Sequence, residues 1–274
     1  MRYFLAMLLC TMMPAISVAK SPSDLVQFKI APTQLRPDKA YFLFRSNRAK
    51  SGLSSLDYVF LRTPTETEIE AYYSAKKIAF EKDLPRLLKN AEKDPKYHSQ
   101  PNIEKYPFVY EESQNIFSVD SGDFLEAGEN RTFLIEIDPG IYIIYGASSA
   151  NDLLTCNCLG SVKFDAQAGI ITNLGSFYLG EVSKESNIPQ LEDNLGKSMG
   201  VYNIILGQAV VPATPDTQVP QSLKSFPLAF AEYEAVGPFL EPGAVGINRL
   251  APIPGILGYD RGKAMDLKAG KIAK

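Results

Sequence analysis

The fold class of this chain is decided by the stretch Arg131-Thr132-Phe133-Leu134-Ile135-Glu136-Ile137-Asp138-Pro139-Gly140-Ile141-Tyr142-Ile143-Ile144-Tyr145. Two runs of β-branched and aromatic residues flank Asp138-Pro139-Gly140, a turn sequence in which proline fixes φ. Runs of this composition, bounded by turn-forming residues, are typical of β-strands. The stretch therefore predicts two strands, 131–137 and 141–145, with a turn between them.

Further strands are expected on both sides of this pair. The same pattern predicts strands over 116–119, 161–165, 170–173 and 177–179, with a positive-φ turn at Ala168-Gly169. Strands are also expected over 25–30, 199–211 and 229–235, and over 40–44 and 56–61, which we interpret as a hairpin. Many short strands at this spacing predict a mainly β fold, either an antiparallel β-sandwich or a barrel-like sheet.

One segment changes from a period of two to the helical period. Thr63-Pro64-Thr65-Glu66 has the residues of a capping box, with proline at the first helical position. Apolar residues then recur mostly at steps of three and four, so they share one face. We expect one long amphipathic helix (about 64–93) as an insertion over 63–93, packed on the sheet and kinked or split at Pro85. Partner binding through the apolar face is the alternative.

The first nineteen residues have the pattern of a secretory signal peptide. Met1-Arg2 is followed by an apolar stretch to Met13 and then by small residues up to Ala19, which are the requirements for export and cleavage. The apolar run is shorter than the roughly 20 residues of a membrane span. We expect cleavage between Ala19 and Lys20, and a periplasmic or extracellular location for the remainder.

Charge and hydropathy limit the partners of residues 20–274, which we expect to be a single β-rich domain. Residues 1–19 hold one of the 28 basic residues and none of the 31 acidic ones, which leaves a net charge of −4. No basic stripe is present that would neutralise phosphates, so nucleic acid is not an expected partner. No later apolar run is long enough to span a membrane. The sequence has no phosphate-binding loop, so no nucleotide cofactor is expected. An envelope protein or a polysaccharide is the expected kind of partner.

The carboxyl-terminal part, 236–274, is expected to be an extended tail. Pro252-Ile253-Pro254-Gly255 cannot form a central strand, because each proline removes a backbone donor. Polar and aromatic groups stand beside this stiff segment at Asn248, Arg249, Tyr259, Asp260 and Arg261. They are the candidate contact surface, although a loop held by its own hydrogen bonds is the favoured interpretation of this segment.

Parts of the chain resemble a known group of proteins. Glu136-Ile137-Asp138-Pro139-Gly140-Ile141-Tyr142, with Phe164, Ala168-Gly169 and Tyr178-Leu179-Gly180, is similar to a pattern in small exported bacterial β-sandwich proteins of unknown function. The tail from Asn248 to Arg261 looks like that of other exported bacterial proteins. The resemblance covers about a third of the chain, and it implies the fold and no catalytic residue.

Cys156-Asn157-Cys158 is the sharpest local feature. A bend at Asn157 would bring the two Cα atoms within the roughly 4.4–6.8 Å that a disulfide requires, and an exported compartment favours the bonded state. The strand context offers neither a helix amino terminus nor a basic group to activate a thiolate. A structural disulfide or two buried thiols are therefore favoured over thiol–disulfide exchange, and a zinc site lacks a fourth ligand, so no metal is expected.

Asp120, Asp123 and Glu126 are the candidate carboxylates for chemistry. A glycosidase needs two carboxyl groups about 5 or 6.5–9.5 Å apart, and the same oxygens suit calcium. An acidic turn around Gly122 is the simpler interpretation. Residues 94–115 are expected to form a loop, and His98, the only histidine, is interpreted as an exposed residue of it. His98 has no nucleophile motif around it, so a serine or cysteine hydrolase is not expected.

Together these observations predict an exported, noncatalytic β-sandwich protein that binds a ligand or associates with the cell envelope, with no catalytic residue assigned. The first alternative is a carboxylate-based, glycosidase-like hydrolase that uses the acidic cluster 120–126. The second is thiol–disulfide exchange at Cys156 and Cys158.

Overall fold

The computed structural model describes residues 25–47, 57–96, 98–110, 115–127, 130–148, 154–179, 208–239 and 246–274. The predicted signal peptide, with its cleavage point between Ala19 and Lys20, lies outside the described residues. Most of the strand expected over 199–211 also lies outside them.

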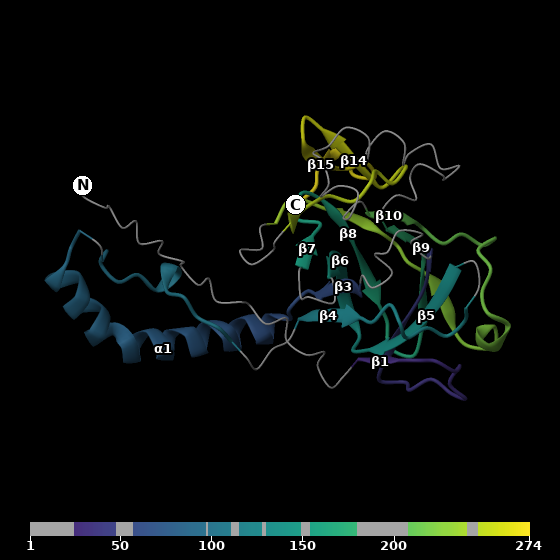
Figure 1. Cartoon of the computed structure of the whole chain (residues 1–274), viewed down its shortest axis with the longest axis horizontal. Coiled ribbons are helices and arrows are strands. Elements are labelled where there is room, and N and C mark those ends of the chain that lie inside the picture. Colours follow the sequence, from purple (N-terminus) through teal and green to yellow (C-terminus); the bar gives the residue numbers. More distant parts are fainter. Residues whose placement is uncertain are drawn as a thin grey trace, which may run out of the picture.

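Two β-sheets packed face to face form the body of the molecule (Figure 1). The first sheet has the order β1 (Val26–Gln27), β5 (Asn130–Ile137), β2 (Ala40–Asn47), β9 (Ile171–Leu179) and β10 (Gln208–Val211), with β11 (Leu228–Phe230) paired to β9. The second has the order β12 (Glu234–Val236), β8 (Ser161–Ala166), β6 (Gly140–Ser148), β3 (Asp57–Arg62) and β4 (Ile116–Val119); β7 (Leu154–Cys156) joins β6, and β13 (Gly246–Ile247) joins β7. The expected mainly β fold is confirmed, without closure into a barrel.

The sheets are mixed rather than purely antiparallel. Strand β2 pairs antiparallel with β5 but parallel with β9, and the β9–β11 and β7–β13 pairs are also parallel. Successive strands often belong to opposite sheets: the turn at Asp138-Pro139 carries the chain from β5 in the first sheet to β6 in the second. The hairpin expected from 40–44 and 56–61 is wrong for the same reason, because β2 and β3 lie in different sheets and face each other.

Aromatic side chains fill the space between the sheets. Phe42 and Phe44 of β2 contact Phe60 of β3, with ring centroids 5.3 and 6.0 Å apart. Phe44 also stacks on Phe133 and Phe177 at 4.8 and 4.7 Å. Burial of large aromatic side chains is the main source of stability in such a core.

Two glycines permit the path of β9. Gly169, with φ +74°, makes the predicted positive-φ turn before the strand. Gly175, with φ +89°, allows β9 to run as one bulged strand where two had been expected. A Cβ at residue 175 would lie 2.1 Å from the carbonyl oxygen of Val211, so only glycine fits there.

The helix expected over 64–93 is present as α1 (Glu66–Lys93), the one α-helix in the described residues. Its N-cap lies two residues later than predicted, at Thr65 rather than Thr63. Thr65 forms the capping box with Glu68. Pro85 does not split the helix. Packing of α1 on the sheet was also predicted and is wrong, because the helix projects away from the sandwich (Figure 1).

The carboxyl-terminal part is more regular than an extended tail. Strands β14 (Leu257–Asp260), β15 (Lys263–Asp266) and β16 (Lys271–Ile272) form a third, antiparallel sheet. In the proline segment before it, the backbone N–H of Ala251 donates to the carbonyl of Gln208 in β10 at 2.9 Å. Residues 254–256 then form a turn, closed by a backbone bridge between Ile253 and Leu257. Prolines exclude a strand only where they stand, and none occurs after Pro254.

Candidate functional site

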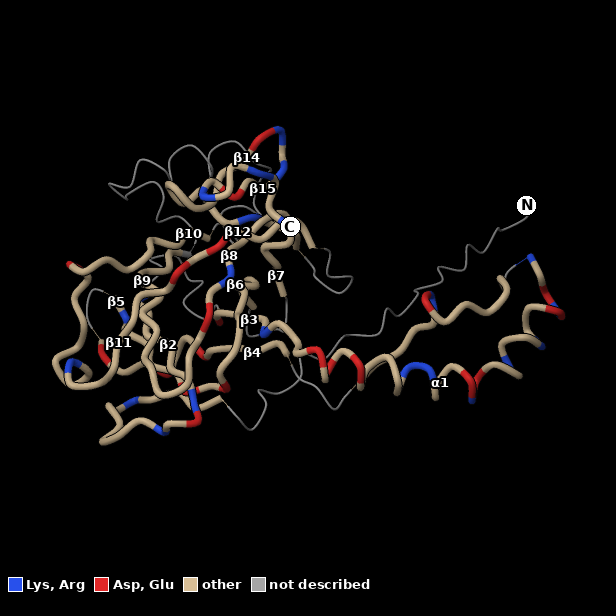
Figure 2. The backbone as a smooth tube through the Cα atoms, turned by 180° about the vertical axis from the view of Figure 1, so that it is seen from behind, with Lys and Arg blue, Asp and Glu red and all other residues tan. Residues whose placement is uncertain are grey.

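The most distinctive feature outside the sandwich is a projecting helical arm, which consists of α1 and the return segment 98–110. The two run beside each other away from the sheets (Figure 1), and the return segment contains the short 3-10 helix η1 (Ile103–Lys105). Acidic and basic residues alternate along the arm (Figure 2), with Glu66 and Glu68 in the first turn of α1 and Lys93 in the last. This placement complements the helix dipole.

Hydrogen bonds and an ion pair fix the base of the arm to the second sheet. The backbone N–H of Thr63 donates to the carbonyl of Ile141 at 2.8 Å, and Arg62 pairs with Glu68 while donating to Asn115 at 3.1 Å. Partial burial of the Glu68 carboxylate acts to raise its pKa, but the backbone hydrogen bond from Thr65 and the ion pair with Arg62 outweigh it and lower the pKa. The ionised form of Glu68 therefore supports the start of α1.

The return segment is held on α1 mainly by aromatic contacts. Tyr72 contacts Phe108 and Tyr110 with centroid distances of 5.6 and 6.0 Å, and Phe80 meets Tyr106 edge to face at 5.4 Å. The Tyr106 hydroxyl donates to the Asp83 carboxylate at 3.1 Å. Desolvation, together with this hydrogen bond, raises the pKa of Tyr106, so its hydroxyl stays protonated at neutral pH and remains the donor.

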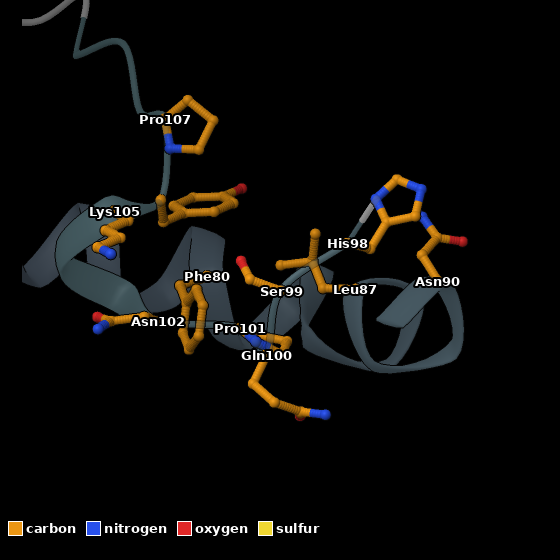
Figure 3. A pocket seen from close by; sticks show the side chains of 11 residues that line it. Phe80, Leu87, Asn90, His98, Ser99, Gln100, Pro101, Asn102, Lys105 and Pro107 are labelled. Atoms are coloured by element: carbon orange, nitrogen blue, oxygen red, sulfur yellow. The ribbon is translucent and has the colours of Figure 1, made fainter. Parts of the chain in front are cut away.

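A cavity of about 230 Å³ lies between α1 and the return segment (Figure 3). Its apolar wall is formed by Phe80, Leu87, Pro101, Tyr106 and Pro107, and its polar groups come from Asn90, His98, Ser99, Gln100, Asn102 and Lys105. In Figure 3, Asn90 and His98 lie toward one end, and Asn102 and Lys105 toward the other. Among these described lining residues, Lys105 carries the one permanent charge and none carries a carboxylate.

The arm also exposes apolar side chains to solvent. Ile69, Tyr73, Ile78 and Leu88 of α1 are 41%, 63%, 67% and 39% exposed. Within α1, all of whose residues are described, only Lys76 and Ala91 are buried. A helix of 28 residues, about 42 Å long at 1.5 Å per residue, usually buries a continuous apolar face, so the arm is weakly covered for its length.

The residues predicted as a contact surface fall into two groups. Asn248, Arg249 and Tyr259 come together: the Arg249 guanidinium lies 4.6 Å from the Tyr259 ring centroid, and the Asn248 backbone N–H donates to the carbonyl of Cys156 at 2.8 Å. Asp260 and Arg261 instead lie at the β14–β15 turn, where Arg261 has φ +47°.

Tyr259 is engaged within the fold. Its hydroxyl donates to the carbonyl of Leu250 at 2.8 Å, and burial raises its pKa, so the phenol remains neutral and acts as a donor. The geometry of Tyr259 therefore suits a loop held by its own hydrogen bonds, which is the interpretation that the sequence favours for this segment.

Cys156 and Cys158 form a disulfide with their Cα atoms 5.1 Å apart. Both residues are fully buried, in a small core cluster with Val59 and Tyr145. The carbonyls of both cysteines accept backbone hydrogen bonds, from Asn248 and Phe239. A partner thiolate must reach a sulfur atom for exchange to occur, so this placement suits a structural disulfide.

The acidic residues lie on and beside one turn. The Asp120 carboxylate accepts from the backbone N–H of Gly122 at 2.7 Å, the Asp123 carboxylate pairs with Lys29 at 2.7 Å, and Glu126 makes a backbone bridge with Thr132. In the described part of the chain, no three His, Cys, Asp or Glu side chains gather closely enough to hold a metal ion. The Asp120 and Asp123 carboxylates thus have local structural roles in the turn.

Sequence reasoning missed the cavity, because the apolar face of α1 was assigned to the sheet and 94–115 was treated as a loop. The signal was present in Tyr106, Phe108 and Tyr110, which alternate with other residues soon after the helix. An aromatic segment that follows an amphipathic helix can fold back and cover the apolar face of that helix. His98, interpreted as an exposed loop residue, lies at the mouth of the cavity and is exposed.

Comparisons with protein-family models, curated proteins and solved structures find no match to this chain. No helix within the described ranges is both long and apolar enough to cross a bilayer. The functional argument therefore depends on the geometry of the arm.

Proposed function

We propose that this chain is an exported, noncatalytic binding protein of the cell envelope, in which the β-sandwich is the support and the helical arm makes the contact. One observation carries the proposal. The described residues of α1 include only two buried ones, Lys76 and Ala91, whereas strands such as β5 and β6 are largely buried. A long helix with half-covered apolar side chains is suited to contact another molecule.

The described lining of the cavity lacks the groups that hydrolysis requires, which supports binding without catalysis. A glycosidase needs two carboxyl groups and a serine or cysteine hydrolase needs a base beside its nucleophile. The described lining of the cavity offers one histidine and one serine, adjacent in sequence at His98 and Ser99 and both exposed, and no hydrogen bond joins their side chains among the described contacts. The three neutral amides in the lining are groups that serve recognition.

The proposed location rests on the signal-peptide pattern of residues 1–19. The disulfide between Cys156 and Cys158 supports it, because disulfides persist in oxidising compartments outside the cytosol. The cell envelope borders such a compartment, so its components are the surfaces that an exported protein can contact there.

Co-sedimentation of the purified chain, without residues 1–19, with isolated cell envelopes of the producing organism tests the proposal. We expect the protein to pellet with the envelopes, and Tyr73→Glu/Leu88→Glu to abolish pelleting, because the charges stand on the exposed arm. The matched control is Phe230→Glu/Ile272→Glu, which places the same charges outside the arm, at side chains of β11 and β16 that are 39% and 48% exposed. Equal pelleting of wild type and arm variant, with both folded by circular dichroism, would contradict the proposal.

A further inference from the structure

We propose that the cavity between α1 and the return segment holds one uncharged hexose ring, supplied by a free sugar or by a unit of an envelope polysaccharide. This inference rests on the proposed binding function of the arm and names its ligand. Four properties of the cavity lead to it: its size, its apolar wall, its polar groups and its charge.

The size accommodates a single ring. Pockets that enclose a drug-sized molecule measure about 300–1,000 Å³, and this cavity measures about 230 Å³, which is large enough for one six-membered ring. Further units of a polymer would have to extend outside it, along the surface of the arm.

The apolar wall offers ring faces rather than hydrogen-bonding groups. The Tyr106 hydroxyl is already engaged with Asp83 at 3.1 Å, so Tyr106 presents its ring to the cavity, at an angle of 73° to the ring of Phe80. Leu87, Pro101 and Pro107 complete this wall. A hexose has an apolar face of C–H groups that packs on such rings, whereas a small polar ion gains nothing there.

The polar groups match hydroxyls. Asn90 provides an amide that both donates and accepts, and hydroxyl groups likewise do both. The side-chain oxygen of Asn102 already accepts from the backbone N–H of Glu104 at 2.8 Å, so Asn102 has its NH₂ group to offer. A sugar ring complements both kinds of group, because its C–H face packs on the apolar wall and its hydroxyl groups hydrogen-bond to the amides.

The charge excludes ionic ligands. One cation, Lys105, stands among the described lining residues, at the opposite end from Asn90 in Figure 3. Tight recognition of a phosphate or carboxylate draws on several cations or a bidentate arginine, and an amine would need a carboxylate that the lining lacks. An uncharged ligand is therefore the one that these groups complement.

Saturation-transfer NMR and calorimetry with glucose, galactose, N-acetylglucosamine and their β-1,4-linked oligomers test the inference on the chain without residues 1–19. We expect at least one ring type to bind, and Asn90→Ala to weaken its binding about threefold to tenfold, the effect of one hydrogen bond. Ser99→Tyr, which places a large side chain among the lining residues, should abolish binding. Ser74→Tyr, at an exposed position of α1 outside the lining, should leave it unchanged.

The outcomes separate the two proposals and the two sources of the sugar. Oligomers that bind more tightly than the single sugar indicate a polysaccharide, and equal affinities indicate a free sugar. The hexose is ruled out if no sugar binds at millimolar concentration, if Ser99→Tyr binds like Ser74→Tyr, or if a proline-rich or aromatic peptide binds in its place. If pelleting with envelopes still depends on Tyr73 and Leu88, the proposed function stands without the hexose. If the wild-type protein does not pellet, the proposed function is overturned as well.

Discussion

The β-sandwich and the helical arm of this chain differ most in how much of their apolar surface is covered. Phe42, Phe44 and Phe60 are at most 1% exposed in the sandwich, whereas Tyr73 and Ile78 of the arm are exposed by more than half. The stability of a segment against local opening follows its buried contacts. The β-sandwich is therefore the rigid support, and the helical arm is the element that opens easily. Segments that bind partners are often of this easily opened kind.

The largest expected effect compares one phenylalanine from each region. Phe44→Ala removes a fully buried ring that stacks on Phe133 and Phe177, and should lower the free energy of unfolding by about 3–5 kcal/mol. Phe80→Ala, in the half-covered arm, should cost less than half as much. Urea unfolding of both variants, followed by circular dichroism, measures this, and equal costs would remove the distinction between the regions.

The disulfide gives a smaller effect that belongs to the sandwich alone. Cys156→Ala/Cys158→Ala removes a cross-link across a very short loop, and the loop-entropy relation gives a loss of about 1.5 kcal/mol. Hydrogen exchange should accelerate in β7 and β13, which pair beside the disulfide, and stay unchanged in α1. Faster exchange in α1 would show that the arm depends on this part of the core.

Tyr106→Phe sharpens the comparison within the arm. It keeps the edge-to-face contact with Phe80 but removes the hydrogen bond to Asp83, so amides 98–110 should exchange faster while the urea midpoint of the whole protein stays the same. Tyr142→Phe is the matched control: it removes the 2.6 Å hydrogen bond to the carbonyl of Asp138 in the sandwich, and should shift the midpoint without changing exchange in 98–110. A shift of the midpoint by Tyr106→Phe would contradict an independently opening arm.

Acidification provides the smallest effect. The pKa of Glu68 in the folded protein is lowered from 4.5, so its contribution to the base of the arm is complete at neutral pH and is lost as the pH falls through the lowered pKa. Amides in the first turns of α1 should therefore exchange faster, relative to their intrinsic rates, as the pH falls through this lowered pKa. Glu68→Gln should show little of this pH dependence, and an unchanged dependence in that variant would assign it to another carboxylate.

Local patterns predicted the strands well, because alternating or continuous apolar runs are a property of neighbouring residues. Strand β4 matches its predicted bounds, and β5 begins one residue earlier than expected. The same patterns could not assign a strand to a sheet, since residues such as Phe42 and Phe60 look alike whether they pair in one sheet or face each other across the core. The predicted hairpin failed for this reason.

The arm shows the same limit at a larger scale. The spacing of Tyr72, Phe80 and Leu87 correctly indicated one apolar face of a helix, but an amphipathic pattern does not identify what covers that face. The cover is the return segment, through Tyr106 and Phe108. Of the candidate sites, the cysteine pair could be predicted from its spacing, whereas the cavity depends on two segments that meet only in the folded chain.

Hydrogen exchange measured by mass spectrometry, on the chain without residues 1–19 free and bound to isolated envelopes, tests the central claim most directly. The account predicts fast exchange in 66–110 of the free protein, slow exchange in β5, β6 and β9, and slowing on binding that is concentrated in 66–110. Slowing confined to the sandwich or to the 248–261 segment, with the arm unchanged, would contradict it.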